Sequence, residues 1–270
     1  MGASTKIPCI KNSMIMRPND FDWLAMLVFL TKVALKKMLG TAKYLHGNFG
    51  YVVSFHSFAA RITTNQMEVK ERILERAHNL FMRYGIRSVS MDDIAAQLGM
   101  SKKTLYQYFS DKDELVEGVI SHKISFMQQE CTHCRKQAKD AVQEVFFTME
   151  NIVEQLRNMN PMVLYDMEKF HFKAYQKFLE HKNKFLLRII EENICWGIKE
   201  ELYRPEINVD VLSKYRLNSM LIAFDQQVFP AGKYNLADVT KEILEHFIYG
   251  LATVKGHKLI QKYKLQYQNT

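Results

Sequence analysis

The segment that decides the fold is residues 73–116, which read ILERAHNLFMRYGIRSVSMDDIAAQLGMSKKTLYQYFSDKDELV. Apolar residues before Gly85 recur at three- and four-residue steps, which predicts a helix with one buried face. They are Val69, Ile73, Ala77, Leu80, Phe81 and Tyr84. Gly85 suits the left-handed residue that ends a helix. We therefore predict a helix that runs from Met67 to the residue before Gly85.

Two short helices are predicted next. Ser90 and Asp93 have the spacing of a capping box, in which each side chain binds the backbone amide of the other residue. This cap begins a helix over residues 91–98, Gly99 ends that helix, and Ser101 caps another one. Two helices joined by a tight glycine-containing turn form a helix-turn-helix, whose second helix enters the major groove of DNA.

The second helix, residues 102–108, has an outward face suited to DNA. With Leu105 and Phe109 turned inward, 100° per residue points Lys103 and Gln107 away from the core. The residues that flank this direction are Lys102, Thr104, Tyr106 and Tyr108. A cation, an amide able to pair with adenine, and hydroxyls for phosphates match the chemistry of a duplex.

A third capping box is predicted at Ser110 and Asp113, at the start of a longer helix. The free amides and the positive dipole end of that helix, together with Lys112, would hold one phosphate.

Taken together, this segment resembles the DNA-binding domain of the tetracycline-repressor (TetR) family over about fifty residues. The resemblance implies an all-α protein, with an N-terminal three-helix bundle that contains the helix-turn-helix and a larger helical domain after it. It implies that Ser90, Tyr106, Tyr108 and Lys112 hold phosphates. It further implies that Lys102, Lys103 and Gln107 face bases. Gln107 stands where family members often have an aromatic residue, so the base preference at that position does not carry over.

Composition is compatible with this interpretation but does not establish it. The chain has 270 residues, 47% hydrophobic and 24% charged, with 11 Gly and 5 Pro, which favours helices over hairpins. Its net charge of +8 is concentrated in residues 1–66, which carry +6, whereas residues 67–123 are neutral. A role in DNA binding must therefore rest on individual cations. Four cysteines are too few for a disulfide scaffold and favour a reducing cytoplasm.

Residues 1–66 differ from the rest and are interpreted as a leader. The longest apolar run, residues 23–30, is too short to span a membrane. We expect Met67 to be the natural start and the leader to be disordered or non-native. The alternative is a membrane-proximal or partner-binding extension. The predicted division is thus 1–66 leader, 67–113 DNA-binding domain, and 114–270 ligand-sensing and dimerisation domain.

Residues 114–270 read as about five further helices, the longer ones over about 140–159, 175–201, 209–228 and 236–255. The resemblance implies that they enclose a cavity for an effector and that the last two pair across a homodimer. For this interface we predict Leu217, Leu221, Phe224, Ile243, Phe247 and Leu251, with packing inside one subunit as the alternative. Methionines and aromatic residues favour a small apolar or aromatic effector. The candidates are Phe146, Met149, Met162, Tyr165, Met167, Phe170, Phe178, Phe185, Trp196 and Tyr215.

Two rival chemistries remain open. Cys131 and Cys134 would lie on one helical face as a metal or thiol sensor, although a second ligand pair is missing. Glu-x-x-His pairs of the kind found in di-iron bundles occur at Glu75/His78, Glu130/His133 and Glu168/His171. No catalytic triad order or nucleotide fingerprint is present, so we expect neither an enzyme nor a cofactor.

Overall fold

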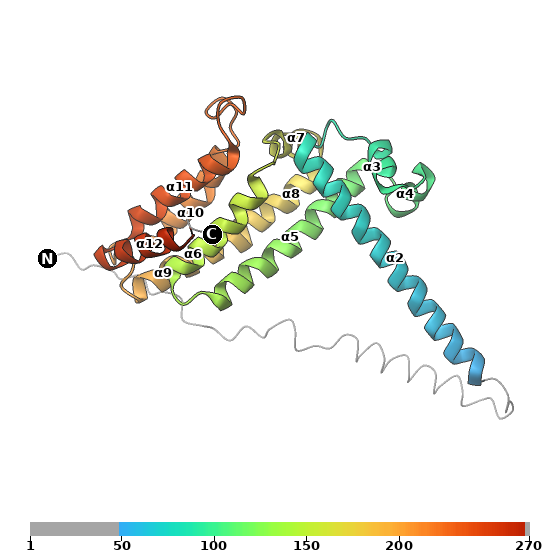
Figure 1. Ribbon diagram of the computed structural model, residues 1–270, viewed down its shortest axis with the longest axis horizontal. Coiled ribbons are helices and arrows are strands. Elements are labelled where there is room, and N and C mark those ends of the chain that lie inside the picture. The colour runs from blue at the N-terminus through green and yellow to red at the C-terminus, as the bar shows by residue number, and fades with distance from the viewer. Residues whose placement is uncertain (1–48, 268–270) are drawn as a thin grey trace. The chain divides into compact units, whose positions relative to one another are not determined.

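The computed structural model describes residues 49–267, and in this part every regular element is helical (Figure 1). One isolated β-bridge joins Tyr203 to Ala252. The elements are α2 (Phe49–Tyr84), α3 (Met91–Leu98), α4 (Lys102–Tyr108), α5 (Lys112–Gln137), α6 (Ala141–Leu156), α7 (Met162–Phe170), α8 (Phe172–Glu180), the π-helical turn η1 (His181–Leu186), α9 (Leu187–Lys199), α10 (Val209–Ile222), α11 (Leu236–Leu251) and α12 (Val254–Tyr267). The all-α prediction is confirmed.

The helix predicted from Met67 begins earlier, at Phe49. Residues 49–66 lack a regular apolar pattern, but adding a residue to an existing helix costs less than starting one. Most of the predicted leader, residues 1–48, lies outside the described residues, and its interpretation stays a prediction. The apolar run at residues 23–30 is in that part. Among the helices that the structure describes, none has the length and apolar character needed to span a membrane.

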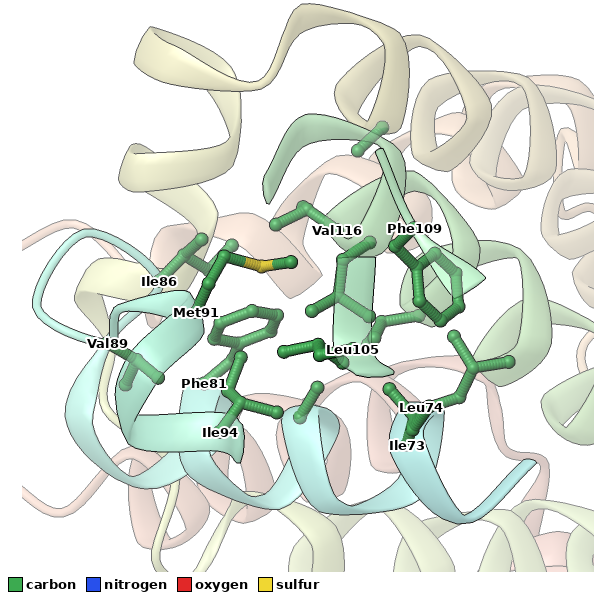
Figure 2. Close-up of a cluster of buried hydrophobic side chains, with 14 of the residues drawn as sticks. Ile73, Leu74, Phe81, Ile86, Val89, Met91, Ile94, Leu105, Phe109 and Val116 are labelled. Atoms are coloured by element: carbon green, nitrogen blue, oxygen red, sulfur yellow. The ribbon is translucent and has the colours of Figure 1, made fainter. Parts of the chain in front are cut away.

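The described residues from 68 onward form one compact unit. Within it, a first core joins α2, α3, α4 and the start of α5, with Phe81, Ile94 and Leu105 at its centre (Figure 2). Val163 and Met167 of α7 belong to the same core. The helix-turn-helix therefore packs on residues beyond the predicted boundary at 113, and that division also stays a prediction.

A second core lies among the C-terminal helices. Tyr203 is fully buried there against Gly197, where any side chain would overlap the Tyr203 ring. The helix predicted over 175–201 begins at Phe172 and contains the turn η1. Helix α10 ends at Ile222, although the pattern predicted Val228, and α12 was not predicted. Apolar residues continue beyond the end of α10 because the loop that follows packs Ala223 and Phe229 beside α11.

Candidate nucleic-acid interface

Helix α3 begins at the capping box that the sequence predicted. The Asp93 amide donates to Oγ of Ser90 at 3.1 Å, and the Ser90 amide donates to Oδ2 of Asp93 at 2.8 Å. The Ser90 hydroxyl also donates to Oδ2 of Asp93 at 2.6 Å, and this bond, followed by the one from the Ser90 amide, lowers the pKa of the Asp93 carboxyl. Val89 and Ile94 are buried beside the cap, as a hydrophobic staple requires. The first helix of the motif thus has a well-defined start.

The turn between α3 and α4 depends on Gly99. Its φ of 65° is left-handed, and its amide donates to the Ala96 carbonyl at 3.1 Å. Ser101 then caps α4, because its Oγ accepts from the Thr104 amide at 3.0 Å. A side chain at position 99 would be strained by that φ, although nothing lies within 4 Å of it. The tight turn predicted at Gly99 between the two helices is therefore present.

Helix α4 presents the outward face that was predicted. Leu105 and Phe109 are 0% and 2% exposed and anchor the helix in the first core. Lys103 and Gln107 are exposed on the opposite side. This exposure confirms the orientation on which the DNA-binding interpretation depends.

The flanking side chains of α4 are partly engaged within the protein. Nζ of Lys102 lies 2.8 Å from a carboxylate oxygen of Asp92, and both groups are exposed. Such an exposed ion pair is screened by solvent and weak, so a phosphate could displace Asp92. Tyr106 is 42% exposed, whereas Thr104 and Tyr108 are half-buried. Lys102 and Tyr106 therefore lie on the exposed face of α4, and Thr104 and Tyr108 lie at its edges.

The predicted cap at Ser110 is wrong by one residue. Asp111 is the N-cap of α5, and its Oδ1 accepts from the Glu114 amide at 2.7 Å. Ser and Asp are both good N-caps. Here the Glu114 carboxylate accepts from the Ser110 amide at 2.7 Å, and this bond favours Asp111 as the N-cap. Three carboxylates now surround this helix start, namely Asp111, Asp113 and Glu114.

Lys112 is also less free than predicted. Its Nζ donates to the carbonyls of Ile86 and Arg87 at 2.7 and 3.4 Å, and burial lowers its pKa. The ammonium holds the loop between α2 and α3 against α5. A phosphate at this position would have to share Lys112 with those carbonyls.

The same loop and the helices α2 and α5 beside it are tied to α7 and the residues that flank it. The Arg87 amide donates to Oδ2 of the buried Asp166 at 2.9 Å, and the Asn160 amide donates to the Met82 carbonyl at 2.6 Å. Nδ1 of His171 lies 2.5 Å from Oδ1 of Asp113. Polar contacts thus connect the helix-turn-helix to the C-terminal helices.

Helices α5, α6, α9, α10 and α11 surround a cavity of about 130 Å³. Most of its lining surface is apolar, with aliphatic side chains that include Val145, Ile152, Ile190, Ile194, Leu244 and Leu251. Its polar lining includes Glu130, Glu144, Asn193 and Arg216. None of the candidate effector residues named from the sequence lines this cavity.

Those candidates lie elsewhere, which corrects their predicted placement. Some are packed in the two cores or against them: Phe146, Met149, Met167, Phe178 and Trp196. Phe185 stacks on His181. The others are exposed, namely Met162, Tyr165, Phe170 and Tyr215. An apolar stripe marks a helix face for burial, but only the packing of several helices decides whether that face meets core or cavity.

The cysteine chemistry is not favoured by its surroundings. Burial raises the pKa of the Cys131 thiol to about 11, and it also raises that of Cys134. A reactive thiol needs a lowered pKa, so both groups are poor redox or metal sensors at neutral pH.

The Glu-x-x-His pairs are dispersed on different helices. Within the described residues, no group of three or more His, Cys, Asp or Glu is arranged to hold a metal ion. His78 lies on α2, His133 on α5 and His171 at the start of α8. The di-iron alternative therefore has no support in this part of the chain.

Comparison with known proteins agrees with the geometry of the motif. Residues 73–119 match the family described as bacterial regulatory proteins, tetR family. Residues 73–119 form a DNA-binding domain of the TetR family. The match covers α3 and α4 and the parts of α2 and α5 that complete the first core.

Similarity to this family extends beyond the motif. The chain is 26% identical over 185 residues to the HTH-type transcriptional regulator YvaF of Bacillus subtilis (strain 168), covering 67% of this chain and 94% of that protein. It is 36% identical over 89 residues to an HTH-type transcriptional regulator of Staphylococcus aureus (strain USA300), covering 33% and 46%. A crystal structure of a TetR-family regulator from Agrobacterium tumefaciens shares the fold, with a TM-score of 0.57 at 15% identity over 69% of this chain and 99% of that one.

Proposed function

We propose that this TetR-family regulator is a ligand-responsive repressor that binds a palindromic operator as a homodimer. The observation that carries the proposal is the exposed pair Lys103 and Gln107 on a short helix anchored by Leu105. A solvent-facing amide and cation on the second helix of this motif are suited to read base edges in the major groove.

The remaining α4 side chains would set the position of that helix on the duplex. Lys102 would join Lys103 and Gln107 near the bases after releasing Asp92. Phosphate contacts are assigned to Ser90, Thr104, Tyr106, Tyr108 and Lys112. The hydroxyl of Ser90 already binds Asp93, and Lys112 binds two carbonyls, so both would contribute less than free groups.

The proposed dimer interface lies on a different face of α10 from the one that the sequence predicted. Leu217, Phe247 and Leu251, predicted for the interface, are buried within one chain, and Leu221, Phe224 and Ile243 are half-buried. By contrast, Val211, Tyr215 and Ile222 are 55%, 53% and 46% exposed. At 100° per residue they fall within about 40° of one another on the helix. An exposed apolar stripe of this kind is suited to a second copy of the chain.

Helix α5 provides the route by which an effector could act. Its N-terminal part packs in the first core through Leu115, Val116 and Val119. Its C-terminal part lines the cavity with Met127, Cys131 and Cys134. A ligand that fits the cavity better in one position of α5 would shift the population toward that position. In a dimer, this shift would change the spacing of the two α4 helices.

Selection of bound sites from random duplexes tests the DNA-binding part of the proposal. The expected product is an inverted repeat whose half-sites lie about 10 base pairs apart, or a multiple of that, centre to centre. Recovery of a single unrepeated site would contradict the homodimeric reader.

Sedimentation of two matched variants tests the interface. Ile222→Asp places a charge in the exposed stripe of α10 and should dissociate the dimer. Leu265→Asp makes the same change at a 64% exposed position of α12 and should not. Equal behaviour of the two variants would place the interface elsewhere.

A further inference from the structure

Arg216 is an unexplained group in the cavity. Its side chain lines the cavity, yet the residue is only 6% exposed. In the described part of the chain, Nη1 of Arg216 is buried without a hydrogen-bond partner. The guanidinium lies 5.8 Å from the centre of the Phe247 ring, which offers only a weak cation–π contact.

Burial of an unpaired charge is costly, so the position calls for a partner. Burial lowers the pKa of Arg216 to about 10, which leaves the group cationic at neutral pH. The carboxylates of the cavity wall are engaged elsewhere. Oε2 of Glu144 accepts from Arg135 at 2.6 Å and from Asn193 at 2.8 Å, and Glu130 accepts from Asn151 at 3.4 Å.

We propose that the cavity binds a small apolar carboxylate, with the ligand's carboxylate paired to Arg216. This inference rests on the proposed function, because it assigns a chemical class to the effector. A guanidinium presents paired N–H donors that match the two oxygens of a carboxylate. The aliphatic wall formed by Val145, Ile194 and Leu244 would enclose the rest of the ligand.

The size of the cavity limits the ligand further. Its volume of about 130 Å³ is close to that of an engineered cavity of about 150 Å³ that accepts benzene. A single ring or a short branched chain with one carboxylate fits this space. A neutral ligand of the same size would leave the guanidinium unpaired, so the structure favours the anion.

Calorimetric titration of the full chain with three probes tests the charge and the size together. Benzoate has both the ring and the carboxylate, benzamide replaces the carboxylate with a neutral group of similar shape, and acetate lacks the ring. We expect benzoate to bind at least about tenfold more tightly than either of the other probes. Equal binding of benzamide and benzoate, or no binding of benzoate, would overturn the inference.

Variants of Arg216 then locate the anion. Arg216→Met should weaken benzoate binding at least about tenfold, and Arg216→Lys should keep the preference for benzoate with lower affinity. The matched control is Lys214→Met, which removes one charge from an exposed side chain of the same helix and should leave binding unchanged.

The thermal stability of the same variants separates a binding role from a structural one. Without a probe, Arg216→Met should have a Tm equal to or above that of the parent chain, because an unpaired buried charge is replaced by an apolar group. A clear fall in Tm would make Arg216 a structural residue and would overturn the assignment.

Operator release, monitored by fluorescence anisotropy, distinguishes ligand binding at Arg216 from the ligand-responsive function. If benzoate binds through Arg216 but leaves operator affinity unchanged, the carboxylate site stands and the ligand-responsive part of the proposed function fails. If no probe binds while the chain still binds its operator, the carboxylate site fails and the DNA-binding function stands.

Discussion

Replacing Gln107 with alanine tests whether α4 reads bases. The Gln107 side chain is exposed and lies on the opposite side of α4 from Leu105, so the free energy of unfolding should change by less than about 0.5 kcal/mol. Each subunit would lose one paired contact to a base, worth about 1–3 kcal/mol, and a dimer would lose about twice that amount. Since about 1.4 kcal/mol is a factor of ten, affinity for the selected site should fall at least about 30-fold.

The assay is a pair of binding titrations, one with the selected duplex and one with a scrambled duplex at the same salt concentration. Binding to scrambled DNA depends on phosphate contacts and should be unchanged. Gln129→Ala, the same substitution at an exposed position of α5, should affect neither duplex. Equal losses on both duplexes, or no loss on either, would refute the assignment of Gln107 to base reading.

Three further predictions concern DNA affinity, pH and packing. Lys112→Met should weaken binding to all duplexes alike and flatten the salt dependence, because the ammonium is assigned to a phosphate; an effect confined to one sequence would contradict this. Burial, followed by the nearby charge of Lys123, lowers the pKa of His78 from 6.5 to about 4. Unfolding therefore takes up a proton between those pH values, and the free energy of unfolding should fall by up to about 3 kcal/mol as the pH is lowered through them. In His78→Gln this part of the pH dependence, measured by denaturant titration, should disappear. Gly197→Ala would overlap the buried Tyr203 ring and should lower Tm, whereas Gly250→Ala, with nothing within 4 Å, should raise stability by about 0.5–1 kcal/mol.

Local features of the motif could be predicted because they depend on residues close in sequence. The bounds of α3 and α4 follow from Ser90, Gly99 and Ser101, whose caps and turn form within three or four residues. The start of α5 was missed by one residue because Ser110 and Asp111 compete for the same role. Even there, the alternatives differed by only one position.

The cavity could not be predicted in the same way. Arg216 lies between Tyr215 and Leu217 in the α10 sequence VDVLSKYRLNSMLI. An exposed arginine at this position would have the same sequence neighbours as a buried one. The only signal was that polar residues at 213, 216 and 219 recur at three-residue steps, and all three are buried together with Leu217. The apolar residues Val211, Tyr215 and Ile222 are exposed in their place, which is the reverse of the usual pattern.

By itself the sequence determined the helix-turn-helix and the direction of Lys103 and Gln107, because helix caps, a glycine turn and a 100° step are properties of a short stretch of chain. Only the tertiary structure decided where α5, α6, α9, α10 and α11 leave a space and which side chains enter it. The physical reason is that burial of a side chain such as Arg216 is set by helices far apart in sequence, and no local pattern records their packing.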